Sequence, residues 1–373
     1  MKNLKTYFIY TFGCQMNKAD SERIAGDYQS RGFRPAKTYK DADEIVVNTC
    51  SVRKSAEDRV IGLLLNLGKL KKQNLAPNET SRGVGKIILT GCMIHHGADK
   101  LLAMMPTIDE ILPINEVGFN SPSVRRDKIN AWVPISNGCN SFCSYCIVPY
   151  SRGRETSRSE KEILQEIAAL VDQGYREITL LGQNVNSYGL DKIGIGLRKS
   201  RPHQGIPPFV KLLQQVCDFK QLKLIRFMTS NPWDFSDALI DCIAKNKAID
   251  RFVHLPVQSG SNQILKLMNR GYTWQDYFNL VKKLKAKVKG LTLGTDIIVG
   301  FPGETKSDFQ DTVNLANQVN WQVAFVAQYS PRPGTVAAKM KDDVSAQEKK
   351  QRWLVLEKLI NQKHMKTRPQ VIK

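Results

Sequence analysis

The chain has 373 residues, of which 42% are hydrophobic and 24% charged, a composition typical of a globular protein with about two to three domains. Its formal net charge is +20, from 55 lysine and arginine residues against 35 aspartate and glutamate residues. A charge of this size favours a polyanionic partner, nucleic acid first and an anionic membrane second. The N-terminal apolar run is short and interrupted, and no stretch is long enough to span a bilayer, which argues against secreted and membrane-spanning classes. These features predict a cytoplasmic protein, in which eight cysteines indicate metal binding or catalysis rather than disulfides.

Residues 1–125 predict an open parallel sheet of three strand–helix units, a Rossmann-like α/β domain. Strands are predicted at 6–11, 43–49 and 86–91, and helices from about 21, at about 55–70 and at about 96–104. Each strand leads to a cysteine, and we call Cys14, Cys50 and Cys92 the N-terminal triad. Because ligands bind outside the carboxyl ends of parallel strands, the triad is predicted to converge on a metal or cluster. The alternative is three buried structural thiols.

A polar segment at 115–130 separates a second series of elements, which predicts a partial (β/α)6 barrel over residues 126–345. Its strands are predicted at 131–136, 176–182, 222–228, 250–256, 291–300 and 321–329. The helix at 159–174 opens with Ser159 and Glu162 in a capping-box pattern. Residues 191–208 form a long basic loop, and residues 346–373 are expected to be a separate C-terminal helix and tail.

Three further cysteines follow the first barrel strand with the spacing C-x3-C-x2-C, and we call Cys139, Cys143 and Cys146 the barrel triad. This position is the carboxyl mouth of the barrel, where active sites of such folds lie. Zinc would require a nearby fourth ligand, and none is adjacent. Cys217 and Cys242 lie in apolar helical patterns and are predicted to be core residues. Two incomplete triads favour two [4Fe-4S] clusters, each with one open iron, and zinc remains the alternative.

The segments around the cysteines resemble the methylthiotransferases of the radical S-adenosylmethionine (SAM) superfamily. The resemblance rests on TFGCQMNKADSERI, NTCSVRKSAEDRV, TGCM, GCNSFCSYCIVPYSRGRE, LLGQNVNSYG, HLPVQSGSNQILKLMNRGYT, TDIIVGFPGET and YSPRPGT. It is closest to the MiaB-type branch, which modifies isopentenyladenosine next to the anticodon of tRNA. It extends from about Thr6 to Arg352 and so covers nearly the whole chain.

The resemblance implies a transferase with two [4Fe-4S] clusters and SAM as cofactors. The barrel triad would hold the cluster whose open iron binds SAM, and the N-terminal triad would hold an auxiliary cluster that carries the sulfur. One SAM would methylate this sulfur, and a second would be cleaved to a 5′-deoxyadenosyl radical that takes hydrogen from carbon-2 of the adenine. Carbon-2 carries no acidic proton, so the reaction needs radical chemistry, which the cofactors supply. Expected partners are tRNA and a low-potential electron donor, and the expected state is a monomer.

Other candidate residues are polar groups near the predicted barrel mouth and basic groups nearby. The cofactor-binding candidates are Tyr145, Gln183, Asn184, Ser230, His254, Gln258, Arg270 and Asp296. The substrate-binding candidates are Arg152 and Arg154, which follow the barrel triad, and Arg198, Lys199 and Arg201 in the basic loop. The lysine-rich run at 282–290 is predicted to be the solvated face of a barrel helix.

Two departures from the family pattern stand out. The small C-terminal RNA-binding domain called TRAM is expected to be absent, and Asn231 stands where the family usually has histidine. Two other activities remain open: methylthiolation of threonylcarbamoyl-adenosine in tRNA, and methylthiolation of a ribosomal protein, for which so basic a chain is poorly matched. The third alternative is a non-enzymatic Fe–S electron-transfer protein.

Overall fold

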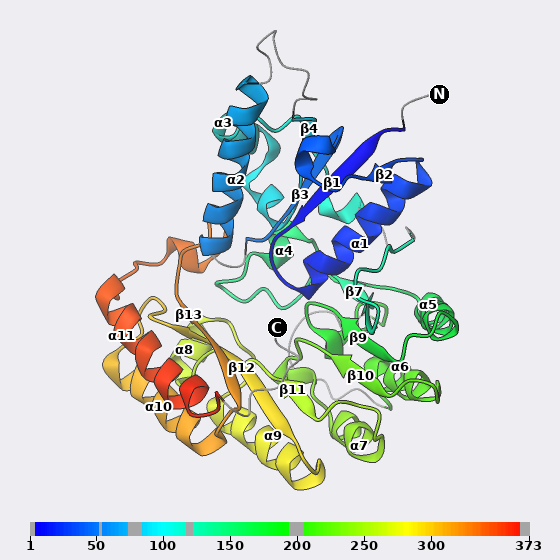
Figure 1. The fold of residues 1–373 in the computed structure, drawn as a ribbon. Coiled ribbons are helices and arrows are strands. Elements are labelled where there is room, and N and C mark those ends of the chain that lie inside the picture. The colour runs from blue at the N-terminus through cyan, green and yellow to red at the C-terminus, as the bar shows by residue number, and fades with distance from the viewer. Residues whose placement is uncertain (1–3, 52–53, 74–83, 117–121, 194–204, 366–373) are drawn as a thin grey trace. The chain divides into compact units, whose positions relative to one another are not determined.

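The protein is described here from a computed structural model, which covers residues 4–51, 54–73, 84–116, 122–193 and 205–365 (Figure 1). The chain separates into two compact units. The first unit comprises Met1–Lys128 and Ile147–Arg154, and the second comprises Ile129–Cys146 and Glu155–Lys373. The first segment thus ends three residues beyond the sequence-based boundary. The assignment of Ile147–Arg154 to the first unit was not predicted.

The first unit is built on a five-stranded parallel sheet in the order β2-β1-β3-β4-β5. Its elements are β1 (Thr6–Thr11), α1 (Gln15–Ser30), β2 (Arg34–Pro35), η1 (Tyr39–Asp41), β3 (Glu44–Thr49), α2 (Lys54–Gln73), β4 (Lys86–Gly91), η2 (Cys92–His96), α3 (Ala98–Met104), β5 (Glu110–Ile111), η3 (Ile114–Glu116) and α4 (Val148–Ser151). The predicted open parallel sheet is confirmed, with β2 and β5 as additional short strands. The first helix begins at Gln15 rather than near residue 21, because Cys14 takes the N-cap position.

Alternation along the central strands explains why the sheet is buried on both faces. Ile45 and Val47 of β3 face the cluster that contains Val60 and Leu64 of α2. Val46, between them, faces the opposite cluster with residues of α1. Because helices cover both faces of the sheet, the sequences of its central strands contain continuous apolar runs, here within EIVV and KIIL.

The second unit contains six parallel strands that follow one another in chain order. They are β6 (Asn130–Pro134), β9 (Glu177–Leu181), β10 (Leu224–Phe227), β11 (Phe252–His254), β12 (Thr292–Val299) and β13 (Val323–Gln328). The first three form one sheet and the last three another. A parallel bridge from Ile225 to Ile249 links the β10 side to the segment that enters β11. The predicted partial (β/α)6 barrel is confirmed.

Helices and short segments connect these strands. They are α5 (Glu160–Asp172), η4 (Val185–Ser187), α6 (Pro208–Cys217), η5 (Pro232–Asp234), α7 (Asp237–Lys245), α8 (Asn262–Leu267), α9 (Trp274–Lys287), α10 (Lys306–Val319), η6 (Ala337–Lys339), α11 (Ala346–Leu356) and η7 (Glu357–Gln362). A short antiparallel pair, β7 (Ser136–Asn137) with β8 (Thr156–Ser157), was not predicted. The cap of α5 is present, since Ser159 Oγ accepts a hydrogen bond of 3.2 Å from the Glu162 N–H.

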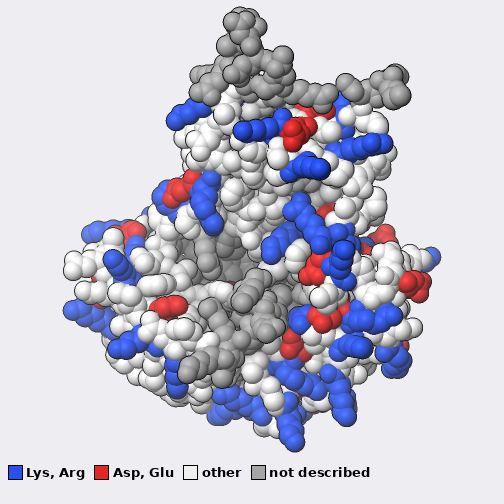
Figure 2. All heavy atoms as spheres, viewed as in Figure 1, with Lys and Arg blue, Asp and Glu red and all other residues white. Residues whose placement is uncertain are grey.

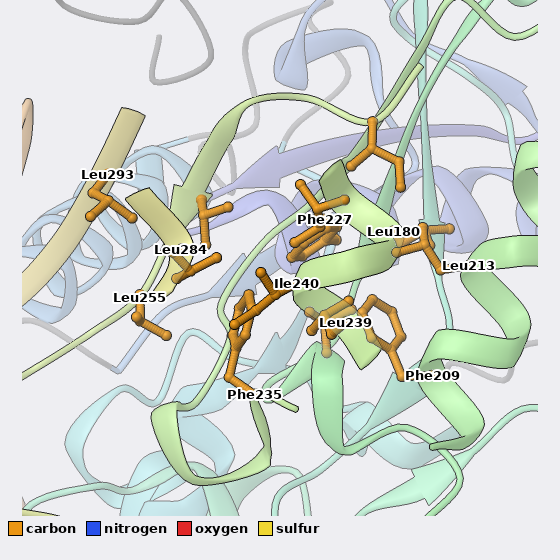
Figure 3. Packing of buried hydrophobic residues seen from close by; sticks show 14 of the residues in the cluster. Leu180, Phe209, Leu213, Phe227, Phe235, Leu239, Ile240, Leu255, Leu284 and Leu293 are labelled. Carbon is orange, nitrogen blue, oxygen red and sulfur yellow. The ribbon is translucent and has the colours of Figure 1, made fainter. Parts of the chain in front are cut away.

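The core of the second unit is formed by strand side chains packed against the apolar faces of the helices (Figure 3). Phe209 of α6 packs edge-on against Phe227 of β10, with ring centroids 5.5 Å apart. Full burial of such side chains stabilises the fold by about 1.5–3 kcal/mol each. Cys242 lies in this core and Cys217 packs against it, as the sequence predicts.

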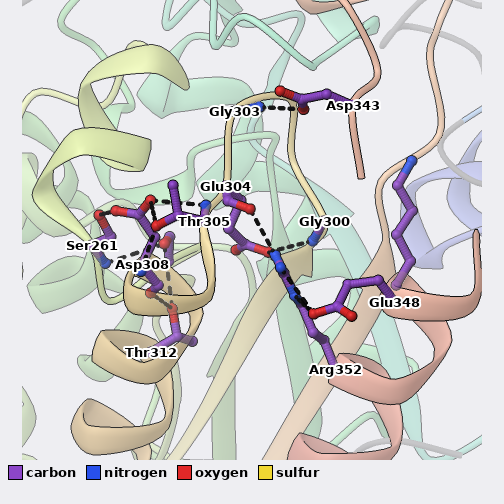
Figure 4. A network of polar contacts seen from close by, with 12 residues as sticks. Ser261, Gly300, Gly303, Glu304, Thr305, Asp308, Thr312, Asp343, Glu348 and Arg352 are labelled. Atoms are coloured by element: carbon purple, nitrogen blue, oxygen red, sulfur yellow. Dashed lines mark hydrogen bonds and ion pairs between the residues drawn. The ribbon is translucent and has the colours of Figure 1, made fainter. Parts of the chain in front are cut away.

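An ion-pair network attaches the C-terminal helix to the loop after β12 (Figure 4). Arg352 of α11 donates to the Glu304 carboxylate at 2.6 Å and to the Glu304 carbonyl at 3.0 Å. The same carboxylate accepts the Gly300 N–H at 2.6 Å. Residues 346–362 therefore belong to the second unit and not to a separate tail.

Basic side chains are scattered over the face shown in Figure 2 and are more prominent there than acidic ones. On α9, Lys283 and Lys287 pair with aspartates of α7 at 3.0 and 2.6 Å. Lys285 donates to the Val319 carbonyl at 2.7 Å. The lysine run thus pairs with neighbouring elements on an exposed helix face. None of the helices in the described ranges has the length and apolar character needed to cross a membrane.

Candidate active site with two cysteine triads

The cysteines of the N-terminal triad follow three adjacent strands of the first unit. Because β1, β3 and β4 are parallel neighbours, Cys14, Cys50 and Cys92 lie at the same carboxyl edge of the sheet. Cys50 and Cys92 are buried, whereas Cys14 is exposed. The predicted convergence of these strand ends is therefore present in the fold.

Asn17, in the first turn of α1, connects the turns that carry Cys14 and Cys50. The Cys14 thiol donates to Asn17 Oδ1 at 3.3 Å. Asn17 Nδ2 donates to Asn48 Oδ1 at 3.0 Å and to the Thr49 carbonyl at 2.9 Å. The two hydrogen bonds that Asn17 Nδ2 donates are buried, so they fix the two turns against each other.

Thr49 continues this connection to the turn of Cys92. Its hydroxyl donates to the Thr90 carbonyl at 2.6 Å and accepts the Met93 N–H at 3.0 Å. Gly91 lies between those two positions with φ +90, and a Cβ there would lie 2.3 Å from the Thr49 carbonyl oxygen. Only glycine fits this close approach of two strand ends.

Arg152 lies beside the N-terminal triad. Its segment belongs to the first unit, where α4 packs against η2. The buried guanidinium lies 2.7 Å from the Asp20 carboxylate. Cys14 is exposed overall, but its thiol group is desolvated, and this desolvation raises the pKa of the thiol. The positive charge of Arg152 acts in the opposite direction and lowers that pKa. Arg152 is predicted from the sequence to contact substrate, and its pairing with Asp20 was not predicted.

The barrel triad lies in the loop after β7 of the second unit. Cys139 and Cys143 are buried, and Cys146 is half-buried. Phe142 between them has φ +44, an unusual conformation for a bulky residue. Asn269 holds it by donating to the Phe142 carbonyl at 2.8 Å, and the Ser144 N–H donates to the Met268 carbonyl at 3.0 Å.

Two side chains donate hydrogen bonds to the sulfurs of this triad. Asn184 Nδ2 lies 3.2 Å from Cys139 Sγ, and Arg270 Nη1 lies 3.3 Å from Cys143 Sγ. Arg270 is held in place by the ring of Trp233, 4.7 Å away. Burial raises the pKa of the Cys139 thiol to about 11. The hydrogen bonds that Asn184 and Arg270 donate to these sulfurs favour the thiolate, and iron bound to the sulfurs would favour it further. The thiolate is the form of cysteine that ligates iron.

The donor sets fit iron–sulfur clusters better than single zinc ions. Sulfurs around one tetrahedral zinc lie about 3.8 Å apart, given Zn–S bonds of about 2.3 Å. Among the residues that the structure describes, neither triad brings its three sulfurs within 4.8 Å of one another. A four-iron cluster spans a wider set of thiolates, and each triad supplies three of its four ligands.

The other cofactor candidates lie at or near the carboxyl ends of the barrel strands. Ser230 is buried, and its hydroxyl has no hydrogen-bond partner among the described residues. The same is true of Nδ1 of His254, whose Nε2 lies 3.2 Å from Asp296 on β12. Gln258 is buried with φ +71 and pairs with β12 through its backbone. These orphan polar atoms are available to a bound ligand.

Some of the remaining candidates lie within the residues that the structure describes, and others lie outside them. Gln183 follows β9, and Tyr145 packs on a small apolar cluster of the second unit. Asn231 caps η5 and donates to Ser187 at 2.8 Å, so the residue that departs from the family pattern holds a loop. Arg154 is exposed. Arg198, Lys199 and Arg201 lie outside the described residues.

Glu155 is a site residue that sequence reasoning missed. It is buried, and its Oε1 has no hydrogen-bond partner among the described residues. Its N–H donates to Asn140, the residue after Cys139, at 3.2 Å. Burial raises its pKa to about 8, with contributions from the carboxylates of Asp191 and Asp234. In the sequence it follows two arginines in SRGRE, and no local pattern there indicates its burial.

Comparison with known proteins identifies the family. Residues 133–316 match the radical SAM superfamily, and residues 6–113 match the uncharacterized protein family UPF0004. The tRNA-2-methylthio-N(6)-dimethylallyladenosine synthase of Carboxydothermus hydrogenoformans is 44% identical over 386 residues, which cover 96% of this chain and 83% of that protein. The protein of the same name from Thermotoga petrophila is 41% identical, over 96% of this chain and 82% of its own.

The chain belongs to the tRNA-2-methylthio-N(6)-dimethylallyladenosine synthase family. The resemblance stated from the sequence motifs is thereby confirmed. For a synthase of this family, SAM and [4Fe-4S] clusters are the cofactors. The two triads described above are the donor sets that fit such clusters.

Solved structures resemble this chain in fold. The radical SAM methyltransferase TsrM from Kitasatospora setae has a TM-score of 0.58 at 14% identity, over 91% of this chain and 77% of its own. The cobalamin-dependent radical SAM enzyme OxsB has a TM-score of 0.57 at 12% identity, over 97% of this chain and 56% of its own. At these identities the likeness concerns the fold alone.

Proposed function

We propose that this synthase converts N(6)-isopentenyladenosine next to the anticodon of tRNA into its 2-methylthio form. In this proposal the barrel triad holds the cluster that binds SAM, and the N-terminal triad holds the auxiliary cluster. The observation that carries the proposal is the presence of one three-cysteine site in each unit of a chain so similar to known synthases. When bound, the cofactors supply the radical and the sulfur that carbon-2 of adenine requires.

The protein's own residues set the charge and geometry around both sites. Asn184 and Arg270 donate hydrogen bonds to sulfurs of the barrel triad, which favours the thiolate form. Arg152 places a positive charge near Cys14 and offsets part of the charge of three thiolates. Ser230 and His254 offer polar atoms to SAM or substrate.

Partners and location follow from the same reaction. A low-potential electron donor would reduce the SAM cluster, and the synthase would act as a monomer in the cytoplasm, where tRNA is found. The exposed guanidinium of Arg154 and the basic loop with Arg198, Lys199 and Arg201 would bind the tRNA backbone. The relatives reported above carry the dimethylallyladenosine name, which favours this substrate over threonylcarbamoyl-adenosine or a ribosomal protein. Their enzymatic names likewise disfavour a purely electron-transferring Fe–S protein.

The test is to express the chain in a bacterial host that lacks its own tRNA methylthiotransferase and to analyse digested tRNA by mass spectrometry. We expect the 2-methylthio form of isopentenyladenosine with the unaltered chain, and only the unmodified precursor with Cys92→Ala or Cys143→Ala. Cys242→Ala is the matched control, because Cys242 is buried in the core of the second unit and belongs to neither triad. Precursor alone from the unaltered chain, with both clusters loaded, would overturn the assignment of substrate.

A further inference from the structure

A cluster outside both triads brings one carboxylate and two imidazoles together in the first unit. It consists of Glu57 on α2 and of His95 and His96 at the end of η2. The ligand atoms of the three side chains lie within 4.8 Å of one another. We propose that this His–His–Glu cluster binds one divalent ion of the zinc or ferrous-iron class, in addition to the iron of the two triads.

The two imidazole rings converge although they belong to consecutive residues. Consecutive residues of a helix do not normally face each other. Here the ring centroids of His95 and His96 are only 3.9 Å apart. Nε2 of His96 lies 3.4 Å from Oε1 of Glu57. Two ligands bound to one tetrahedral ion at about 2.1 Å are separated by about 3.4 Å, so this pair already has the required spacing.

Contacts behind the three side chains have the pattern that orients metal ligands. Nδ1 of His95 lies 2.7 Å from the Cys92 carbonyl oxygen. Because a carbonyl only accepts, Nδ1 carries the proton in the neutral ring, and Nε2 carries the lone pair. The Ser51 hydroxyl donates to the carboxylate of Glu57. Ligating histidines almost always donate their other N–H in this way, and ligating carboxylates are themselves hydrogen-bonded.

Burial and ligand chemistry indicate the class of ion. The side chains of Glu57 and His96 are only 12% and 14% exposed, so the carboxylate has lost most of its hydration and would be stabilised by a bound cation. Two imidazoles with one carboxylate suit zinc or ferrous iron, whereas magnesium and calcium prefer sites made of oxygen ligands.

A bound ion would join the turns of two cysteines of the N-terminal triad. Ser51 directly follows Cys50, and the carbonyl that positions His95 belongs to Cys92. The ion would thus tie both turns to α2 and hold them for the auxiliary cluster. This role rests on the proposed function, whereas binding of the ion does not.

The experiment uses the untagged full chain with both clusters reconstituted under anaerobic conditions, so that the six cysteines are occupied by iron. Equilibrium dialysis against Zn²⁺ is followed by measurement of zinc and iron per chain by elemental mass spectrometry. We expect about one zinc per chain with unchanged iron, and loss of that zinc in H95Q/H96Q. H364Q removes a half-buried histidine of the second unit and should bind zinc like the unaltered chain.

A subtler variant keeps the proposal testable if H95Q/H96Q misfolds or loses iron. S51A retains all three ligands and removes only the hydrogen bond to Glu57, so we expect zinc affinity to fall by roughly tenfold. The absence of zinc binding, equal zinc in H95Q/H96Q (an adventitious ion only), or unchanged affinity in S51A would each overturn the proposal. Zinc binding without tRNA methylthiolation would instead refute the proposed function alone.

Discussion

The guanidinium of Arg152 lies 2.7 Å from the carboxylate of Asp20, inside the unit that carries the N-terminal triad. Arg152 follows the barrel triad by only a few residues in sequence, yet its segment packs on η2, which begins with Cys92. Its buried guanidinium lowers the pKa of the Cys14 thiol, so we propose that it acts on the charge of the auxiliary site.

Arg152→Met is expected to make the auxiliary cluster harder to reduce, because a positive charge near its thiolates favours the reduced form. Removal of one buried charge should lower the midpoint potential by on the order of 50–100 mV. The measurement is potentiometry followed by electron paramagnetic resonance in a C139A/C143A/C146A background, where only the auxiliary cluster remains. Arg154→Met removes a nearby exposed arginine and should leave the potential unchanged. Equal potentials for R152M and its parent would contradict this role.

Arg270→Met is expected to impair the barrel triad, because it removes the N–H donor to Cys143 and leaves Trp233 without its cation. We expect 5′-deoxyadenosine formation from SAM to fall by at least about tenfold, which corresponds to one charge-assisted hydrogen bond of about 1.5–3 kcal/mol. The assay uses a C14A/C50A/C92A background, in which only the barrel triad can bind an iron–sulfur cluster. Arg226→Met is the matched control, because Arg226 is also half-buried and ion-paired but bonds to Glu177 and Asp250. Normal SAM cleavage by R270M would show that the hydrogen bond from Arg270 to Cys143 is not required for this reaction.

Glu155→Gln is expected to change how stability depends on pH. Burial raises the pKa of Glu155 to about 8 from its ordinary value of 4.5, so the folded state binds its proton more tightly than the unfolded state. Its contribution is therefore fully present below about pH 4.5 and is lost as pH rises to about 8. Glutamine mimics the neutral acid at every pH, so E155Q should gain stability relative to the unaltered chain as pH rises, by up to a few kcal/mol.

Urea unfolding of the anaerobic, reduced chain at pH 6 and pH 8.5 measures this effect. The control is Glu162→Gln on the exposed face of α5, for which the two pH values should give the same difference from the unaltered chain. A pH-independent difference for E155Q would mean that Glu155 is ionised throughout, with a partner that stabilises its charge.

Local patterns in the sequence predicted the central strands and the position of a cysteine after each of β1, β3 and β4. The runs in β3 and β4 are apolar because helices cover both faces of the sheet, and such runs are visible without knowledge of the fold. The strands β2 and β5 have two residues each, too few to show any period. The positions of Arg152 and Glu155 depend on contacts with distant segments, which no local pattern records.

Gly91→Ala tests whether the close approach of two strand ends is required for the N-terminal triad. Gly91 has φ +90, and an added Cβ would lie 2.3 Å from the Thr49 carbonyl oxygen, where backbone must move. Gly32 provides the control, because it has φ +83 but nothing within 4 Å of an added Cβ. Gly32→Ala should cost only the conformational strain of about 1–2 kcal/mol. Gly91→Ala should lower the free energy of unfolding in urea by more than this amount. It should also lower the iron content in a C139A/C143A/C146A background, because Cys50 and Cys92 follow the displaced strand ends. Full auxiliary iron in G91A would show that the triad tolerates this displacement.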